Sequence, residues 1–199
     1  FVLATLLIAA PLSTHAAVIG KPKSFLKLTS GLVGYWTFDG KDMLNGKALD
    51  KSGNNNTGSL VNIATSTFYK AGKIGQAFNF DGVNDYVSLT SKPTVFTSPF
   101  IIAAWVKTNT IVGNHQIFTS NANQFYQSGT SLSYQTNGGN TNFTGAFTGK
   151  IGKWQHVAVK YDGTSITLYV NGVAGTPDTR AVVDGGTTTI GRYSTVATE

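Results

Sequence analysis

The chain has 199 residues, which is enough for one domain with a sizeable core and short appendages. Charged residues make up only 12% of the chain, about half of the usual ~25%, and aromatic residues another 12%. The absence of cysteine excludes disulfides and thiolate metal sites, so the fold depends on its core.

The net charge of +6 comes from thirteen lysines spread along the chain and only two arginines, Arg180 and Arg192. A surface that follows nucleic-acid phosphates needs clustered basic residues. Since the sequence has no basic run, we do not expect nucleic-acid binding. The lysines are interpreted as solvated side chains on exposed strand faces, where they also protect sheet edges.

An apolar run, Phe1 to Leu12, begins the chain and has the length of a signal-peptide core. Thr14 and Ala16 fit the −3 and −1 positions of a cleavage site after Ala16. A membrane anchor is the alternative, but the run is too short to span ~30 Å of hydrocarbon. The sequence therefore predicts a secreted or cell-surface protein that is not inserted in the membrane after its signal peptide is removed. The predicted organisation is a signal peptide at 1–16, which lacks its positively charged first part, a linker at 17–30 and a folded domain at 31–199.

The first predicted strand of the domain is GLVGYWTFDG (31–40), with Trp36 and Phe38 on one face. An Asn- and Gly-rich loop follows at 49–60, where side chains can satisfy their own backbone. The segment 72–89 is predicted to be a hairpin with its turn at Asp81-Gly82.

A nearly continuous apolar stretch, SPFIIAAWVKTN (98–109), is best interpreted as a strand buried on both faces. A short helix is the competing interpretation, but Pro99 and the β-branched residues favour a strand. More polar strands are expected around 116–118, 124–126 and 131–135, before an Asn/Gly/Thr-rich loop at 136–145.

The strongest pattern is KWQHVAVKYDGTSITLYVNGV (153–173), which predicts three strands joined by two tight turns. Apolar residues alternate with polar or small ones, and Asn171-Gly172 is a strong hairpin signal. The side chains expected to face the core are Val157, Val159, Ile166 and Leu168. Another strand is expected to start in TTTIG (187–191).

The fold class predicted from these elements is all-β. Many short strands with closely spaced turn signals indicate an antiparallel two-sheet sandwich, and specifically a jelly roll. Few Glu and many Thr, Val, Tyr and Phe agree with this class. The three tryptophans, which lie in or beside apolar strands, are expected in the core: Trp36, Trp105 and Trp154.

Four segments together resemble the laminin G-like jelly roll of the concanavalin A-like lectin/glucanase superfamily: GLVGYWTFDG, LDKSGNNNTGSL, GKIGQAFNFDGVNDYVSL, and GKWQHVAVKYDGTSITLYVNGV followed by TIGR. Their order and spacing match that family over most of 31–194. The family usually continues with a strand similar to F-x-G-x-I-D-E-V-R-I-Y. Nothing follows Glu199 here, so the resemblance implies a C-terminally truncated domain that lacks its last strand.

The resemblance raises glycosidase activity, because glucanase-like members carry clustered Glu and Asp on one strand. Glycoside hydrolysis needs two carboxyl groups that flank the scissile bond. The sequence has a single Glu, Glu199, and no carboxylate cluster. His156 lies in a strand pattern typical of the family, where a structural role is favoured, and His115 is distant from it in sequence. We therefore predict no enzymatic activity and no zinc site.

Calcium is the more plausible inorganic ligand, because Ca²⁺ prefers carboxylate, amide and carbonyl oxygens in loops. The candidate ligands lie in two loops that a jelly roll could bring together: Asp39, Asp50, Asn54 and Asn55. Some laminin G-like domains resemble this arrangement. The alternative is that these side chains only cap turns. A weaker second candidate is DGVND, with Asp81, Asn84 and Asp85.

Sugar recognition combines amide and hydroxyl hydrogen bonds with aromatic stacking. The loops 113–127 and 135–148 carry both kinds of side chain, and the candidate ligand-binding residues are Tyr126, Tyr134, Asn137, Asn140 and Phe143. The alternative is an ordinary set of polar loops. The function that we predict is a secreted, non-catalytic module that binds a glycan or an extracellular protein, and the alternative function is a structural spacer or adhesion repeat without a small ligand.

Overall fold

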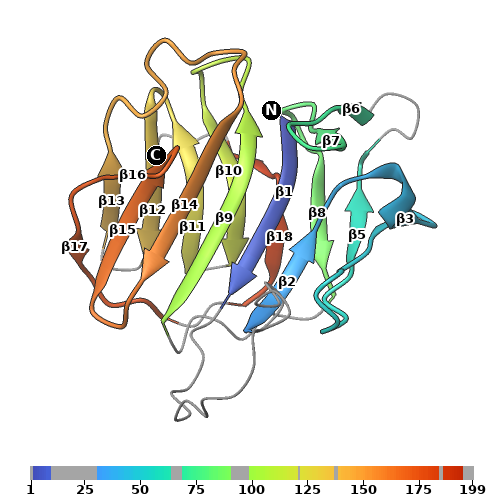
Figure 1. Ribbon diagram of the computed structural model, residues 1–199, viewed down its shortest axis with the longest axis horizontal. Helices are drawn as coiled ribbons and strands as arrows, with labels where there is room; N and C mark the ends of the chain where they lie inside the picture. Colours follow the sequence, from blue (N-terminus) through green and yellow to red (C-terminus); the bar gives the residue numbers. More distant parts are fainter. Residues whose placement is uncertain are drawn as a thin grey trace, which may run out of the picture.

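The computed structural model describes residues 2–9, 31–63, 69–90, 99–120, 122–136, 139–183 and 186–194. These residues form two antiparallel sheets packed face to face (Figure 1). Within them the helical structure is limited to one 3-10 turn, Gly40–Asp42. The predicted all-β jelly-roll sandwich is confirmed.

Sheet A has the strand order β16-β15-β14-β9-β1-β7-β6, and β2 and β17 pair with β1 and β15. Its strands are β1 (Val2–Ala9), β2 (Leu32–Trp36), β6 (Tyr69–Ala71), β7 (Gln76–Asn79), β9 (Phe100–Lys107), β14 (Gln155–Tyr161), β15 (Ser165–Val170), β16 (Val173–Ala174) and β17 (Asp178–Thr179).

Sheet B has the order β13-β12-β11-β10-β18-β8-β5-β4-β3, and β19 pairs with β10. Its strands are β3 (Met43–Leu44), β4 (Lys47–Ala48), β5 (Gly58–Val61), β8 (Tyr86–Leu89), β10 (Asn114–Ser120), β11 (Asn123–Ser128), β12 (Ser131–Thr136), β13 (Gly139–Phe143), β18 (Thr188–Ile190) and β19 (Tyr193–Ser194).

The hairpin β14–β15 has the predicted register and orientation. Val159 lies opposite Leu168, and Val157 lies opposite Val170. All four residues that were expected in the core, including Ile166, are buried. The turn that follows β15 has Asn171 at φ 52° and Gly172 at φ 81°, the positive values that a two-residue hairpin turn requires.

The tryptophans divide between the core and the outer surface. Trp36 is fully buried, and its indole N–H donates to the backbone oxygen of Asn56 (3.0 Å). Trp105 is only half-buried, because its neighbours Ala104 and Val106 face the core and the period of two turns Trp105 outward. Trp154 is also half-buried. The expectation that all three lie in the core was wrong for Trp105 and Trp154.

Strand β9 confirms the strand interpretation of the apolar stretch near residue 100. It pairs with β14 on one side and β1 on the other. Ile102 and Val106 are buried in the core, whereas Ile101 on the opposite face is 42% exposed. The strand is therefore buried fully on its inner face and only partly on its outer face.

The segment Val2–Ala9, which the sequence analysis placed in a signal peptide, forms β1 in the middle of sheet A (Figure 1). Leu3, Leu6 and Ile8 belong to the core. The expected cleavage site with Thr14 and Ala16, and the linker 17–30, lie outside the described residues, so the signal peptide stays a prediction. Among the described residues no helix is long and apolar enough to cross a membrane.

Candidate functional site

The outer face of sheet B carries a line of uncharged polar side chains that crosses six strands. Residues that lie directly opposite each other on neighbouring strands share a face of the sheet. By this criterion one line runs through Ser88, Thr189, Thr119, Gln124, Gln135 and Asn140. The hydroxyl of Thr189 is buried and makes no hydrogen bond with the residues that the structure describes.

A second line of polar residues runs beside the first, through Gln116, Tyr126, Ser133 and Asn142. The ten residues of the two lines are called the polar face below. The phenol of Tyr126 is 5% exposed, and burial raises its pKa, while a hydrogen bond with Ser133 acts in the opposite direction. The tyrosine therefore stays neutral at physiological pH and can both donate and accept a hydrogen bond.

The polar face exists because aromatic side chains fill the opposite side of the same strands. Phe118, Phe125 and Tyr134 lie opposite one another in register and belong to the core. Phe125 and Tyr134 each lie between two residues of the polar face, and Phe118 comes directly before Thr119. A bulge between Gln116 and Phe118 interrupts the alternation on the other side of Phe118. The alternation of the strands therefore turns the amides and hydroxyls outward.

Hydrogen bonds between strands hold the amides of the polar face in place. The Nε2 of Gln116 donates to Oε1 of Gln124 (2.8 Å), and the hydroxyl of Thr119 donates to Oε1 of Gln116 (3.3 Å). On the next pair of strands, the hydroxyl of Ser133 donates to Oδ1 of Asn142 (2.7 Å). The donors and acceptors are thus fixed before any ligand arrives.

An aromatic residue and a cation lie at the border of the polar face. Tyr86 shares the outer side of β8 with Ser88, two residues away. The guanidinium of Arg192 lies over its ring, 5.8 Å from the centroid. Arg192 is exposed, and its backbone oxygen accepts from the N–H of Gln116 (2.9 Å). This border adds stacking and charge to a face that otherwise offers neutral hydrogen bonds.

The structure separates the five residues that were predicted to bind a ligand. Tyr126 and Asn140 lie on the polar face, on β11 and β13. Tyr134 is 1% exposed and packs against Phe100, with 6.2 Å between ring centroids. Phe143 packs against the core, and Asn137 lies outside the described residues. Tyr134 is therefore enclosed in the core, whereas Phe143 is only partly buried.

The eight members of the polar face that the sequence analysis missed all lie within strands and not in loops. They are Gln116, Thr119, Gln124, Ser133, Gln135, Asn142, Ser88 and Thr189. The alternation in Ser131–Gln135 was the available signal, because Leu132 and Tyr134 share one side while Ser133 and Gln135 share the other.

The carboxylate of Asp50 organises a loop. Its Oδ1 accepts from the backbone N–H groups of Tyr35 (2.9 Å) and Ser52 (2.8 Å). Its Oδ2 accepts from the hydroxyl of Ser52 (2.8 Å) and the N–H of Asn56 (2.9 Å). The amide of Asn54 donates to the oxygen of Leu32 (2.7 Å). These groups point at protein donors and acceptors, as turn capping requires.

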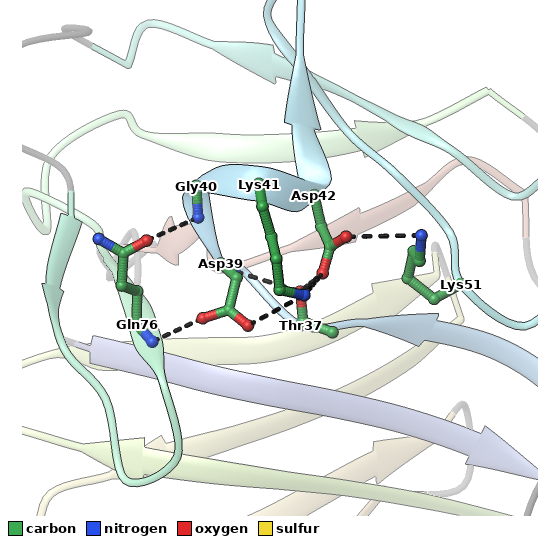
Figure 2. Close-up of polar contacts among 7 residues, drawn as sticks. All are labelled: Thr37, Asp39, Gly40, Lys41, Asp42, Lys51 and Gln76. Carbon is green, nitrogen blue, oxygen red and sulfur yellow. Dashed lines mark hydrogen bonds and ion pairs between the residues drawn. The ribbon is translucent and has the colours of Figure 1, made fainter.

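The carboxylate of Asp39 takes part in a different set of contacts, with Gln76 and Lys41 (Figure 2). Its Oδ1 accepts from the N–H of Gln76 (2.6 Å), and its Oδ2 lies 3.6 Å from the ammonium of Lys41. Lys41 also contacts the buried Asp42 (2.8 Å), which Lys51 approaches at 3.5 Å. The positive charge in this cluster comes from lysines.

The predicted calcium ligands therefore do not form one set of oxygen donors. Asn55 is exposed and has a positive φ of 60° as a turn residue. At the second candidate, Oδ1 of Asp81 accepts from the N–H groups of Val83 and Asn84, and Oδ2 of Asp85 accepts from the N–H of Asp81. Among the described residues, no group of three or more His, Asp or Glu side chains could hold a metal ion.

The two described histidines lie far from each other in the sandwich. His115 is buried at the start of β10, and burial lowers its pKa. His156 lies on the outer face of sheet A beside Trp105, with 5.2 Å between ring centroids, and burial lowers its pKa as well. Neither histidine belongs to the polar face.

Comparisons with known proteins agree with the architecture. A family model described as the concanavalin A-like lectin/glucanases superfamily matches residues 81–197. The chain is similar in structure to domain 4 of AbnA, a GH43 extracellular arabinanase from Geobacillus stearothermophilus that was solved in complex with arabinotriose. The TM-score is 0.57 and the sequence identity is 17%, and the match covers 73% of this chain and 81% of that chain.

Two weaker structural similarities are to alginate lyases. One is AlgAT5 from polysaccharide lyase family 7, with a TM-score of 0.40 and 9% identity over 96% of this chain and 83% of the lyase. The other is the alginate lyase from Corynebacterium sp., with a TM-score of 0.35 and 12% identity over 96% and 82%. No curated protein matches the sequence significantly. At 17% identity, the similarity to the arabinanase domain shows a shared fold.

Proposed function

Because the chain belongs to the concanavalin A-like lectin/glucanase superfamily, we propose that it is a secreted, non-catalytic module that binds a glycan on the polar face of sheet B. The observation that carries the proposal is the continuous line of amides and hydroxyls across six strands. Sugar hydroxyls both donate and accept hydrogen bonds, and such side chains match both roles.

The extent of the polar face favours an oligosaccharide chain over a single sugar. Six strands give five spacings of about 4.8 Å, so the line is roughly 24 Å long. Its residues are uncharged, which suits neutral sugar rings along the line. Tyr86, half-buried at the border of the face, supplies the aromatic surface that accompanies hydrogen bonds in sugar sites, while the buried Tyr126 contributes its hydroxyl.

The similar arabinanase domain was solved with arabinotriose, a neutral trisaccharide, and belongs to an extracellular enzyme. That likeness supports a neutral glycan ligand and an extracellular location for this chain. The composition of the polar face supports binding without hydrolysis, because glycoside hydrolysis needs two carboxyl groups and the ten residues of the face include none.

Calcium is not part of this proposal. Asp50 already accepts four hydrogen bonds, and Asp39 contacts Gln76 and Lys41. The predicted calcium site is tested separately, by thermal unfolding of an Asp50 variant.

The alternatives are a structural spacer and a module for a protein partner. A glycan array with the purified chain separates them from the proposal, and reproducible binding to neutral oligosaccharides of three or more units is expected. The double variant Gln135→Ala, Asn140→Ala should lose about tenfold in affinity, because each neutral hydrogen bond contributes roughly 0.5–1.5 kcal/mol.

The matched control is Lys160→Ala, an exposed residue of β14 on the outer face of sheet A, which should bind as the unchanged chain does. A chain that binds no glycan on the array acts as a spacer or binds a protein. A chain whose binding is lost equally in the double variant and the control does not use the polar face.

A further inference from the structure

The strand β1 lies in the centre of sheet A, although no tight turn joins it to β2, the next strand along the chain. It runs antiparallel to β9 on one side and to β2 and β7 on the other (Figure 1). Neighbouring antiparallel strands can be joined by as few as two residues. Here residues 10–30, which are not described, separate Ala9 from the turn at Gly31 before β2. Pairing and packing with the neighbouring strands therefore hold β1 in place, and not a tight turn.

The side chains of β1 match that space closely. Leu6 lies opposite Trp36 of β2 and Ala104 of β9, and Ile8 lies opposite Gly34 and Ile102. Leu3, Leu6 and Ile8 have no solvent exposure, while Thr5 and Leu7 are half-buried on the outer face. The alternation of fully buried and half-buried positions fixes both the register and the face of the strand.

Removal of β1 would leave two open edges in the middle of a sheet. β9 pairs with β1 from Val2 to Ala9, with a bulge between Leu3 and Thr5. On the other side, β2 pairs with Leu6 to Ala9 and β7 pairs with Val2 and Leu3. These strands would expose unpaired N–H and C=O groups, which are the template on which another strand adds. The hole in the core would also have to be filled, because buried apolar side chains would lose their partners.

We propose that the space between β9 on one side and β2 with β7 on the other is a strand-acceptor site. It binds an apolar segment that is antiparallel to these neighbours, with large aliphatic side chains at the positions of Leu6 and Ile8. Val2–Ala9 of the same chain fills the site, and does so without needing its covalent connection. A cut such as the predicted cleavage after Ala16 then leaves the strand bound as a peptide, and the site takes up a second peptide of the same pattern when that strand leaves.

The first test cuts the full chain. A protease recognition sequence inserted between Gly20 and Lys21 changes none of the described contacts. After complete cleavage we expect the N-terminal fragment to coelute with the rest of the chain in size exclusion, and thermal unfolding to become dependent on protein concentration. Release of the fragment with an unchanged melting temperature for the remaining chain would overturn the proposal, because the site would then not need a strand.

The second test measures exchange into the cut protein. A fluorescent peptide of residues 2–9 with added terminal lysines is mixed with the cut complex in moderate urea, which is then diluted. About one label per domain is expected. A Leu6→Asp peptide should be incorporated at least tenfold less, whereas a Leu7→Lys peptide, changed at an outward position, should still be incorporated. No incorporation, or equal incorporation of the Leu6→Asp peptide, contradicts a strand-acceptor site. The result does not depend on whether the polar face binds a glycan.

Discussion

The side-chain amide of Gln116 on β10 donates to the carbonyl oxygen of Gln124 on β11 across 2.8 Å. This bond orients the side chain of Gln124, whose N–H groups can donate to a ligand. Gln116 is 2% exposed and also accepts from Thr119. The pair therefore fixes the orientation of a donor in the middle of the polar face, which lowers the entropy cost of binding there.

The two tyrosines that the sequence analysis proposed for ligand binding should behave differently when their hydroxyls are removed. Tyr126 lies on the polar face, so Tyr126→Phe should weaken glycan binding by about 0.5–1.5 kcal/mol. The hydroxyl of Tyr134 is buried in the core without a hydrogen bond to the described residues. Tyr134→Phe should leave binding unchanged and stability equal or higher, by up to ~1 kcal/mol. Titration calorimetry and urea unfolding of both variants check this, and a larger binding loss for Tyr134→Phe would contradict the assignment of faces.

The core assignment of β14 is tested by an acidic substitution. Val159 has no solvent exposure, so Val159→Asp should lower the free energy of unfolding by roughly 3 kcal/mol or more, because it buries an unpaired charge. The neighbouring Lys160 is exposed, and Lys160→Asp should change it by less than about 0.5 kcal/mol. Similar urea midpoints for the two variants would show that the strand is not oriented as described.

These residues also show what the sequence could predict. Alternation along β14 and β15, with Asn171-Gly172 between β15 and β16, determines the strands, the turn and the inward face, because the pattern repeats without interruption. Along β12 the same alternation predicts that Tyr134 faces the core with Leu132. Its residue type and its position near a loop instead favoured a role in ligand binding. Its place opposite Phe125 settles that it faces the core.

Two features could not be predicted in this way. The line of polar residues joins the consecutive strands β10 to β13 with β8 and β18, which lie far from them and from each other in sequence, so its full extent appears only when the pairing of strands is known. An apolar run such as Val2–Ala9 fits a signal peptide and a buried strand equally well, because its side chains are apolar at nearly every position. The pairing of β1 with β9, β2 and β7 could not be predicted from any residue of the run alone, and the signal peptide stays a prediction.

The role of Asp50 is tested by removal of its carboxylate. Asp50→Ala should lower the free energy of unfolding by roughly 2 kcal/mol or more, since four donors would lose a charged acceptor. The loss should be the same in EDTA and in millimolar Ca²⁺, and the unchanged chain should melt at one temperature in both buffers. A Ca²⁺-dependent rise in melting temperature that Asp50→Ala abolishes and Asp178→Ala keeps would instead establish the predicted calcium site.

The stability of the protein should decrease in acid, partly through Asp42. Burial opposes ionisation of this carboxyl, but hydrogen bonds from Lys41 and Thr37 outweigh it and hold the pKa below its ordinary value of 3.8. A lowered pKa in the folded state adds stability above pH 3.8 that is lost as the pH falls further. Asp42→Asn should therefore be destabilising at pH 6, and the difference from the unchanged chain should shrink toward pH 3.

Asp85 supplies a control of opposite sign for this pH dependence. Burial raises the pKa of Asp85 above 3.8, and the nearby charge of Asp81 contributes in the same direction. Its ionised form therefore costs stability, and the cost grows as the pH rises through the raised pKa. The stability of Asp85→Asn relative to the unchanged chain should improve from pH 3 to pH 6. Urea unfolding at four pH values measures both variants, and trends of the same sign would contradict these assignments.

The central claim, that a glycan binds along the polar face of sheet B, is tested most directly by chemical-shift mapping. The ¹⁵N-labelled chain is titrated with the tightest oligosaccharide from the array. We predict that the largest shifts lie in β10, β11, β12 and β13, including the side-chain amides of Gln124, Gln135 and Asn140, with little change in β14 and β15. Shifts concentrated on the outer face of sheet A, around Trp105 and His156, with the amides of the polar face unmoved, would contradict the claim.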